Sequence, residues 1–229
     1  MGILIAGAIW DMDGVLVDSG PFHFQSWQIV LKKHGTSISM DKFKSTFGQD
    51  NRGVLTEVFG HPPQEELLQT ISEEKESLYR SLVKGSAHSL PGVLEWLQRF
   101  RDHGVRQAVA SSAPPANVDT LIDEMKLKPY FDQTLSALGQ GLPGKPNPAI
   151  FLRAAELLRV EPAKCVVFED SLAGIEAARR AGMACVAITS THPRHELGQA
   201  NLIVDDFNSI PLEYFQYEPA TNRVENSRP

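Results

Sequence analysis

The stretch AGAIWDMDGVLVDSG, residues 6–20, decides the fold. It carries an apolar run that ends at Trp10, and Asp11, Asp13 and Gly14 follow at once. Because side chains alternate along a strand, Asp11 and Asp13 are expected on the same side of it. A glycine lets the backbone turn and approach a small anion closely. The stretch therefore predicts a buried strand that ends on two carboxylates and a tight turn.

Apolar runs and helical patterns alternate along most of the chain. The apolar runs do not switch regularly between apolar and polar residues, as expected for parallel strands that helices cover on both faces. They span residues 3–11, 105–112, 164–170, 183–190 and 200–206, and the helical patterns span 91–104, 114–127, 147–160 and 171–183. This order predicts an α/β fold with a doubly wound, Rossmann-like parallel sheet.

Residues 20–86 break this alternation, because they hold helical patterns and no apolar strand. A Ser-Gly-Pro sequence marks the start of the segment and Lys-Gly-Ser marks its end, and both are typical of hinges. We therefore expect a small all-helical cap domain, residues 20–86, inserted after the first strand of an α/β core formed by 1–19 and 87–212. The polar tail, 213–229, is expected to be disordered.

The composition is that of an ordinary globular protein of 229 residues, with 42% hydrophobic residues and a net charge of −6. A nucleic-acid partner would require a basic surface, so we expect none. The apolar segment 1–10 is too short to cross a membrane and lacks the positive charge of a signal peptide, so we expect no membrane partner. Cys165 and Cys185 lie in apolar runs and are expected to be reduced core residues, which favours a cytoplasmic protein.

Polar side chains follow the ends of several predicted strands. Ligands of open α/β sheets bind outside the carboxyl ends of the strands, so these positions indicate a site. Three strand ends carry acids or a hydroxyl, and a lysine stands on a Gly/Pro-rich loop between two of them. The residues are Asp11, Asp13, Ser111, Lys145, Glu169 and Asp170. We expect the fold to bring all six to one rim of the sheet.

The residue types on this rim suit phosphoryl transfer. Crowded carboxylates repel one another unless a cation joins them, and Mg²⁺ prefers oxygen ligands of this kind. A carboxylate can also attack phosphorus and form an aspartyl phosphate. The Lys145 ammonium can neutralise phosphoryl oxygens, and the Ser111 hydroxyl can donate to them. The rim therefore predicts a magnesium-dependent site for a phosphate group.

Taken singly, these residues have plainer interpretations. Asp170 can be only the N-cap of the next helix, and Lys145 only a surface residue. Residues 139–145 fit the GxxxxGK phosphate-loop pattern, but Pro146 replaces the hydroxyl residue that would bind Mg²⁺. A receiver-like signalling module also uses acids, a hydroxyl and a lysine, yet it has no large helical insert. The conjunction at successive strand ends favours an enzyme.

With these residues the chain resembles the haloacid dehalogenase (HAD) superfamily over nearly its whole length. The segment Asp11-Met12-Asp13-Gly14-Val15 resembles the first motif of that superfamily. Ser111 resembles the second motif, Lys145 in GKPNPAIF the third, and Glu169-Asp170 in VVFEDSLAGIEAA the fourth. The subgroup that the chain resembles most is that of the β-phosphoglucomutase-like phosphatases and mutases, which carry a helical cap.

The resemblance implies a role for each motif residue. Asp11 would be the nucleophile that takes the phosphoryl group, and Asp13 the general acid and then the general base. Mg²⁺ would be held by Asp11, the backbone carbonyl of Asp13 and Asp170, with Glu169 as a helper. The implied catalytic set is Asp11, Asp13, Ser111 and Lys145.

The resemblance places substrate recognition in the cap and beside the motifs. His23 matches a histidine near the hinge of the mutase, and Lys75 matches a lysine that binds phosphate there. Asn51 falls where the mutase has an arginine that grips a second phosphate, and Arg52 lies one place away. Lys75 has a plainer interpretation as one charge on a solvated helix face. The expected substrate-binding residues are Gly14, Ser19, His23, Asn51, Arg52, Lys75 and Ser112.

The sequence thus predicts a Mg²⁺-dependent phosphatase that hydrolyses a small phosphorylated metabolite, in the first place a sugar phosphate, through an aspartyl phosphate on Asp11. The alternative is a phosphosugar mutase, with β-phosphoglucomutase as the candidate. A mutase needs its cap to hold a second phosphate, whereas a phosphatase does not. We expect a monomer whose partner is its small phosphorylated substrate.

Overall fold

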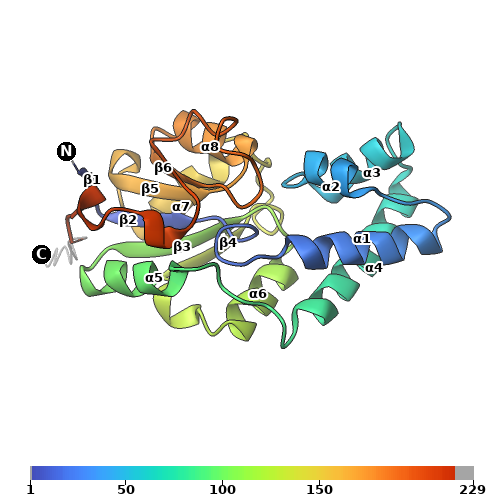
Figure 1. Cartoon of the computed structure of the whole chain (residues 1–229), viewed down its shortest axis with the longest axis horizontal. Coiled ribbons are helices and arrows are strands. Elements are labelled where there is room, and N and C mark those ends of the chain that lie inside the picture. Colours follow the sequence, from blue (N-terminus) through green and yellow to red (C-terminus); the bar gives the residue numbers. More distant parts are fainter. Residues whose placement is uncertain (1, 220–229) are drawn as a thin grey trace, which may run out of the picture.

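The computed structural model describes residues 2–219, and Figure 1 shows a sheet with helices on both faces and a group of helices beyond one end of it. The six strands of this sheet are parallel and lie in the order β4-β3-β2-β5-β6-β7. They are β2 (Gly7–Trp10), β3 (Arg106–Ser111), β4 (Gln133–Ser136), β5 (Cys165–Glu169), β6 (Ala184–Ile188) and β7 (Leu202–Val204). The predicted α/β fold with a doubly wound parallel sheet is confirmed.

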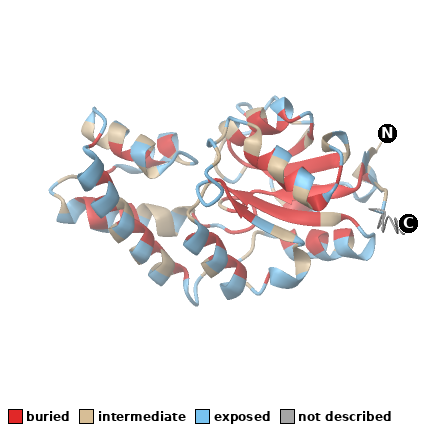
Figure 2. Ribbon diagram, turned by 180° about the vertical axis from the view of Figure 1, so that it is seen from behind, coloured by how far each residue is buried: buried red, intermediate tan, exposed pale blue. Residues whose placement is uncertain are grey.

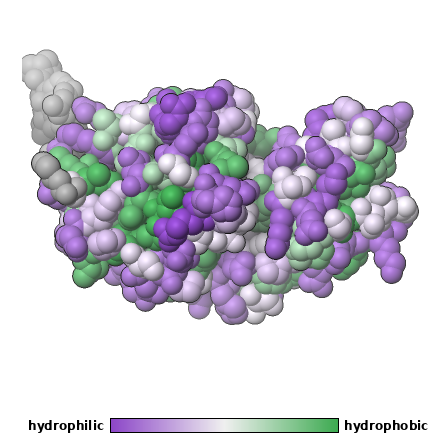
Figure 3. Space-filling view, turned by 45° about the horizontal axis from the view of Figure 1, so that its top comes forward, coloured by the Kyte–Doolittle hydropathy of each residue, from purple (hydrophilic) through white to green (hydrophobic). Residues whose placement is uncertain are grey.

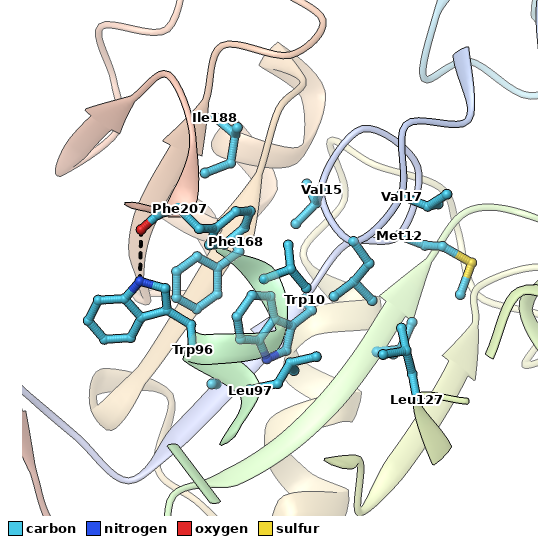
Figure 4. Close-up of a cluster of buried hydrophobic side chains, with 14 of the residues drawn as sticks. Trp10, Met12, Val15, Val17, Trp96, Leu97, Leu127, Phe168, Ile188 and Phe207 are labelled. Carbon is cyan, nitrogen blue, oxygen red and sulfur yellow. Dashed lines mark hydrogen bonds between the residues drawn. The ribbon is translucent and has the colours of Figure 1, made fainter. Parts of the chain in front are cut away.

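Two hydrophobic clusters cover the two faces of the sheet. Because side chains alternate along β2, Trp10 enters one cluster and Ile9 enters the other. In Figure 4 Trp10 lies beside Phe168 of β5, and their ring centroids are 4.1 Å apart. The Trp10 face is covered by α5 (Val93–Asp102) and α6 (Pro115–Glu124), and the Ile9 face by α7 (Ala149–Leu158) and α8 (Leu172–Arg180). Buried on both sides, the strands hold their carboxyl ends in fixed positions.

Four helices form an insert between β2 and β3. They are α1 (Gly20–Lys33), α2 (Met40–Thr46), α3 (Asn51–Phe59) and α4 (Glu65–Val83). Helix α1 packs against α4, and a separate hydrophobic cluster with Trp27, Leu31 and Leu55 lies among the four helices. Figure 2 shows buried stretches of the insert helices apart from the buried sheet. The insert therefore has a core of its own, and its status as a separate domain stays a prediction.

Both ends of the described chain differ from the sequence-based expectation. The predicted strand 3–11 is divided at Ala6 into β1 (Ile3–Ile5) and β2. Strand β1 pairs in parallel with β8 (Phe215–Tyr217) in a small second sheet. Phe215 is buried in the hydrophobic core, so the predicted disorder of 213–229 is wrong for its first residues. The rest of that segment, 220–229, lies outside the described residues.

Strand β4 was absent from the sequence prediction. It lies at the edge of the sheet beside β3, and two of its four residues are buried. Its sequence, QTLS, is short and three of its four residues are polar, which gives no apolar run to detect. The remaining elements are single turns of 3-10 helix at Lys128–Tyr130, Pro162–Lys164, Phe207–Ser209 and Leu212–Tyr214.

The outside of the molecule is largely hydrophilic on the face drawn in Figure 3, with smaller hydrophobic patches among the charged side chains. Within residues 2–219, no helix has both the length and the apolar character needed to span a membrane. Cys165 and Cys185 are buried and free, as predicted.

Candidate active site

The carboxyl ends of three neighbouring strands bring the motif residues together. Strand β2 pairs with β3 on one side and with β5 on the other, so Asp11 lies between the ends of these two strands. Ser111 ends β3, and Glu169 ends β5 with Asp170 directly after it. Lys145 comes from the loop between β4 and α7. The predicted gathering of polar residues at one rim is therefore seen in the structure.

Lys145 joins two of the buried acids. Its Nζ donates to an oxygen of Asp11 and, at 2.6 Å, to Oε1 of Glu169. Burial would lower the pKa of Lys145, but the two carboxylates outweigh this effect and raise it, so the side chain stays an ammonium. Burial raises the pKa of Asp11 to about 7, against the opposing effect of Lys145. The interpretation of Lys145 as a surface residue is wrong.

The acids of the rim fit a divalent cation. Asp11, Glu169 and Asp170 each offer a carboxylate oxygen, and these oxygens lie within 4.8 Å of one another. Burial raises the pKa of Asp170, and the charges of Glu169 and Asp11 raise it further. One lysine ammonium cannot balance three carboxylates, and oxygen ligands are those that Mg²⁺ prefers. The residues present therefore suit Mg²⁺.

The three acids are not equivalent as ligands. Oε2 of Glu169 accepts hydrogen bonds from the backbone N–H groups of Asp170 and Ser171 and from the Ser171 hydroxyl, at 2.9–3.0 Å. Its other oxygen accepts from Lys145. Both oxygens of Glu169 are thus engaged, which leaves Asp11 and Asp170 as the side chains with free lone pairs for a cation. Glu169 fits the helper role that the resemblance implied.

Two hydroxyl residues that sequence reasoning missed lie beside Asp170. The Thr191 hydroxyl donates to Oδ2 of Asp170 and orients it, whereas the Ser190 hydroxyl donates to the Gly14 carbonyl at 2.5 Å. Both residues follow the carboxyl end of β6, the next strand after β5 in the sheet. The strand-end rule that identified the other site residues would have found them, had it been applied to β6.

Gly14 lies directly against the metal-ligand candidate Asp170. Its φ is +80°, in the left-handed region that favours glycine, and a Cβ built on it would collide with the Asp170 carboxylate. Gly14 does not line the cavity described below, so its predicted contact with substrate stays a prediction. Its observed role is to leave room for Asp170.

The variant Gly14→Ala should lower kcat/KM by about tenfold or more, because the added methyl group displaces the Asp170 carboxylate. A loss of about 1.4 kcal/mol of transition-state stabilisation corresponds to a tenfold lower rate. The backbone strain of a non-glycine residue at positive φ adds about 1–2 kcal/mol of instability. Steady-state kinetics and thermal unfolding measure the two effects separately.

The matched control is Gly35→Ala. Gly35 also has a positive φ, +75°, but no atom lies within 4 Å of a Cβ placed there. This variant should lose stability and keep its activity. Equal activity losses in the two variants would contradict the role assigned to Gly14.

Asp13 of the core accepts hydrogen bonds from two side chains of the insert. Its Oδ1 lies 3.1 Å from Nε2 of His23 and 3.2 Å from the Tyr79 hydroxyl. Burial alone would raise the pKa of Asp13, but the hydrogen bonds and positive charges around it, those of His23 first and that of Lys75 after it, together outweigh burial and lower it to about 2. Tyr79, which sequence reasoning missed, stacks on the His23 ring at 4.0 Å. It stands one helical turn after Lys75, and that spacing was the signal available in the sequence.

Lys75 determines the tautomer of His23. Its Nζ lies 2.9 Å from Nδ1 of His23, and an ammonium can only donate, so Nδ1 accepts and Nε2 carries the hydrogen that Asp13 receives. Burial and the charge of Lys75 lower the pKa of His23, which keeps the ring neutral. Lys75 itself is buried, so its interpretation as a charge on a solvated helix face is wrong.

A cavity of about 590 Å³ lies between the rim and the insert, within the 300–1,000 Å³ or so that is usual for small-molecule sites. The predicted residues that line it are Asp11, Asp13, His23, Asn51, Arg52, Lys75, Ser111, Ser112, Lys145 and Asp170. Glu76, Arg80 and Asn117 also line it, and sequence reasoning missed all three. Ser19 does not line it, and within the described chain its buried hydroxyl has no hydrogen-bond partner.

Asn51 and Arg52 differ in their surroundings. Asn51 donates through Nδ2 to Oε1 of Glu76 at 2.9 Å. Arg52 has an exposed side chain and forms an ion pair of 2.6 Å with Glu65 at the start of α4. Asn51 is therefore hydrogen-bonded to another residue that lines the cavity, whereas Arg52 is paired with an exposed residue.

Comparison with known proteins places the chain among hydrolases. The model of the haloacid dehalogenase-like hydrolases matches residues 5–182. A phosphorylated carbohydrates phosphatase of Thermotoga maritima is 34% identical over 179 residues, which is 76% of this chain and 81% of that protein. A chloroplastic 5-amino-6-(5-phospho-D-ribitylamino)uracil phosphatase of Arabidopsis thaliana is 29% identical over 218 residues, which is 93% of this chain but 58% of that longer protein.

The fold is also that of a solved relative. The crystal structure of a β-phosphoglucomutase from Clostridium difficile superposes with a TM-score of 0.82 and 29% sequence identity, covering 92% of this chain and 95% of that one. The helical insert is therefore part of the likeness, because the superposition covers nearly all of both chains.

Proposed function

Because the chain belongs to the haloacid dehalogenase-like hydrolase family, we propose that it is a Mg²⁺-dependent phosphatase that hydrolyses a small sugar phosphate through an aspartyl phosphate on Asp11. The chain is a phosphoric monoester hydrolase. The observation that carries the finer proposal is the position of Asp11 between Lys145 and Asp170, with Asp13 beside it at the end of β2. These groups can attack phosphorus, hold the phosphoryl oxygens and move a proton. We also propose that the protein is a monomer of the cytoplasm.

In the first half of the reaction, a carboxylate oxygen of Asp11 attacks phosphorus, and the bond from phosphorus to the alcohol oxygen breaks. Asp13 gives its proton to that leaving oxygen. A phosphate bound beside Asp13 adds a negative charge that raises its pKa from the low value of the free site, which favours the protonated form at this step. Lys145 and Ser111 hold the oxygens of the transferred phosphoryl group.

In the second half, Asp13 takes a proton from water, the water oxygen attacks the phosphorus of phospho-Asp11, and the bond from phosphorus to the Asp11 oxygen breaks. The products are free phosphate and the Asp11 carboxylate, so the enzyme returns to its starting state. Asp11, Asp170 and the Asp13 carbonyl would hold Mg²⁺, which when bound would supply positive charge near the phosphoryl oxygens. His23 and Tyr79 orient the Asp13 carboxylate in the free site.

The second candidate is a phosphosugar mutase. It is favoured by the likeness to a β-phosphoglucomutase structure and by the contact of His23 and Lys75 beside Asp13. In a mutase the second acceptor is a hydroxyl of the sugar phosphate rather than water, so the two candidates differ only in what attacks phospho-Asp11.

One assay separates the candidates. Purified protein with Mg²⁺, β-glucose 1-phosphate and a trace of glucose 1,6-bisphosphate is followed for glucose 6-phosphate and free phosphate together. A phosphatase should release free phosphate without forming an isomer of the substrate. The substrate that it hydrolyses is expected to be β-glucose 1-phosphate or one of fructose 1-phosphate, fructose 6-phosphate and ribose 5-phosphate. Glucose 6-phosphate formed faster than free phosphate would support the mutase instead. No turnover of any of these compounds would remove the sugar assignment.

A further inference from the structure

One carboxylate in the wall of the cavity receives hydrogen bonds from three different helices. Oε1 of Glu76, on α4, accepts from Nζ of Lys75 and from Nδ2 of Asn51 at the start of α3, each at 2.9 Å. Oε2 accepts from Nδ2 of Asn117, on α6 of the core, at 2.6 Å. The proposed reaction uses none of these three contacts.

Arg80 fixes the direction of the Asn117 amide. Its NH1 donates to Oδ1 of Asn117 at 2.9 Å, so the amide must present its NH₂ group to Glu76. Asn117 is 1% exposed and Glu76 is 7% exposed, so both groups have little contact with solvent. The arrangement is a built network rather than a chance surface contact.

The network withdraws the donors that could bind a second anion in this cavity. Lys75, Asn51 and Asn117 line the cavity, and all three donate to Glu76. Burial opposes the charge on Glu76, but Lys75 outweighs it and lowers the pKa of Glu76, so the carboxylate is ionised at neutral pH. Of the two arginines in the wall, Arg52 is paired with Glu65, and Arg80 donates through NH1 to Oδ1 of Asn117. A second phosphate would therefore meet an anion whose nearby donors are already engaged.

We propose that Glu76 restricts the enzyme to monophosphates with an uncharged leaving alcohol, by excluding a second phosphate from the part of the cavity lined by α3, α4 and α6. This inference rests on the proposed phosphatase function and adds to it the class of leaving group and the residue that selects it. It also separates this chain from an enzyme that must hold a bisphosphate.

The test compares two substrates that share the same scissile phosphate. The wild-type enzyme and Glu76→Gln are assayed for release of the 1-phosphate from fructose 1-phosphate and from fructose 1,6-bisphosphate. For two like charges about 6 Å apart in partly buried surroundings, we expect a wild-type preference for the monophosphate of about ten- to a hundredfold in kcat/KM. Glu76→Gln should reduce that preference by about tenfold, whatever it does to kcat.

Two further variants serve as a charge control and as a substitute for Glu76→Gln. Glu66→Gln removes the same charge from an exposed position on the first turn of α4 and should leave the preference unchanged. If Glu76→Gln does not fold, Asn51→Lys supplies a compensating cation beside Glu76 and should also reduce the preference.

The outcomes distinguish the two proposals. A wild-type enzyme that hydrolyses both compounds with equal kcat/KM, or a preference that neither Glu76→Gln nor Asn51→Lys alters, would overturn the role of Glu76 and leave the phosphatase standing. Hydrolysis of neither compound, nor of any other phosphomonoester of the panel, would remove the phosphatase function and this inference with it.

Discussion

Asp11→Asn is expected to abolish phosphate release, with kcat lower by about four orders of magnitude or more, because the variant lacks the attacking oxygen while the other site groups remain. An amide does not form the acyl phosphate that the proposed reaction needs. The measurement is release of free phosphate from the best substrate of the panel, continued long enough to detect slow residual turnover.

The fold of Asp11→Asn should be intact. The substitution removes one of three carboxylates crowded at the rim, so thermal unfolding should occur at the same temperature or a higher one. Asp18→Asn is the matched control, because Asp18 is exposed and lies in the same segment after β2. Asp18→Asn should keep full activity. Activity retained in Asp11→Asn would contradict the assignment of the nucleophile.

Removal of divalent metal is the second change with a very large expected effect. Exhaustive treatment with EDTA should silence the enzyme, and Mg²⁺ in excess should restore it. The physical reason is the rim itself, where Lys145 alone cannot balance Asp11, Glu169 and Asp170 once a phosphate adds further negative charge.

Stability gives a readout of the metal that is independent of activity. Mg²⁺ that binds the folded state should raise the midpoint of thermal unfolding as its concentration rises. Asp170→Asn should shift both the activation curve and the stability curve to higher Mg²⁺ concentrations. Full activity after complete removal of metal would contradict the metal assignment.

The core site was accessible from the sequence because it depends on a simple rule of the fold. Parallel strands place their carboxyl ends at one edge, so the acids after β2 and β5 and the serine that ends β3 had to meet once the strands were recognised. The positions of Asp11, Ser111 and Asp170 could therefore be predicted without knowing how side chains pack. The strands themselves were visible because burial on both faces makes them apolar throughout.

The rest of the site depends on contacts between segments that lie far apart in the sequence. Lys75 resembles an ordinary helix-surface charge until α1 places His23 against it and the insert buries both. The three donors to Glu76 come from α3, α4 and α6, and no local sequence pattern in any of these helices predicts that their side chains contact Glu76. Similarly, β8 is recognisable only through its pairing with β1.

Rapid quenching of Asp13→Asn with p-nitrophenyl phosphate should reveal whether Asp11 carries the phosphoryl group. The p-nitrophenolate leaving group needs no proton, so Asp11 should still be phosphorylated, whereas hydrolysis of phospho-Asp11 should be slow without the base. We expect a burst of one p-nitrophenolate per active site and one added phosphoryl group on the peptide that contains Asp11. Absence of the burst, with no phosphoryl group on that peptide, would contradict the role of Asp11 as the carrier of the phosphoryl group.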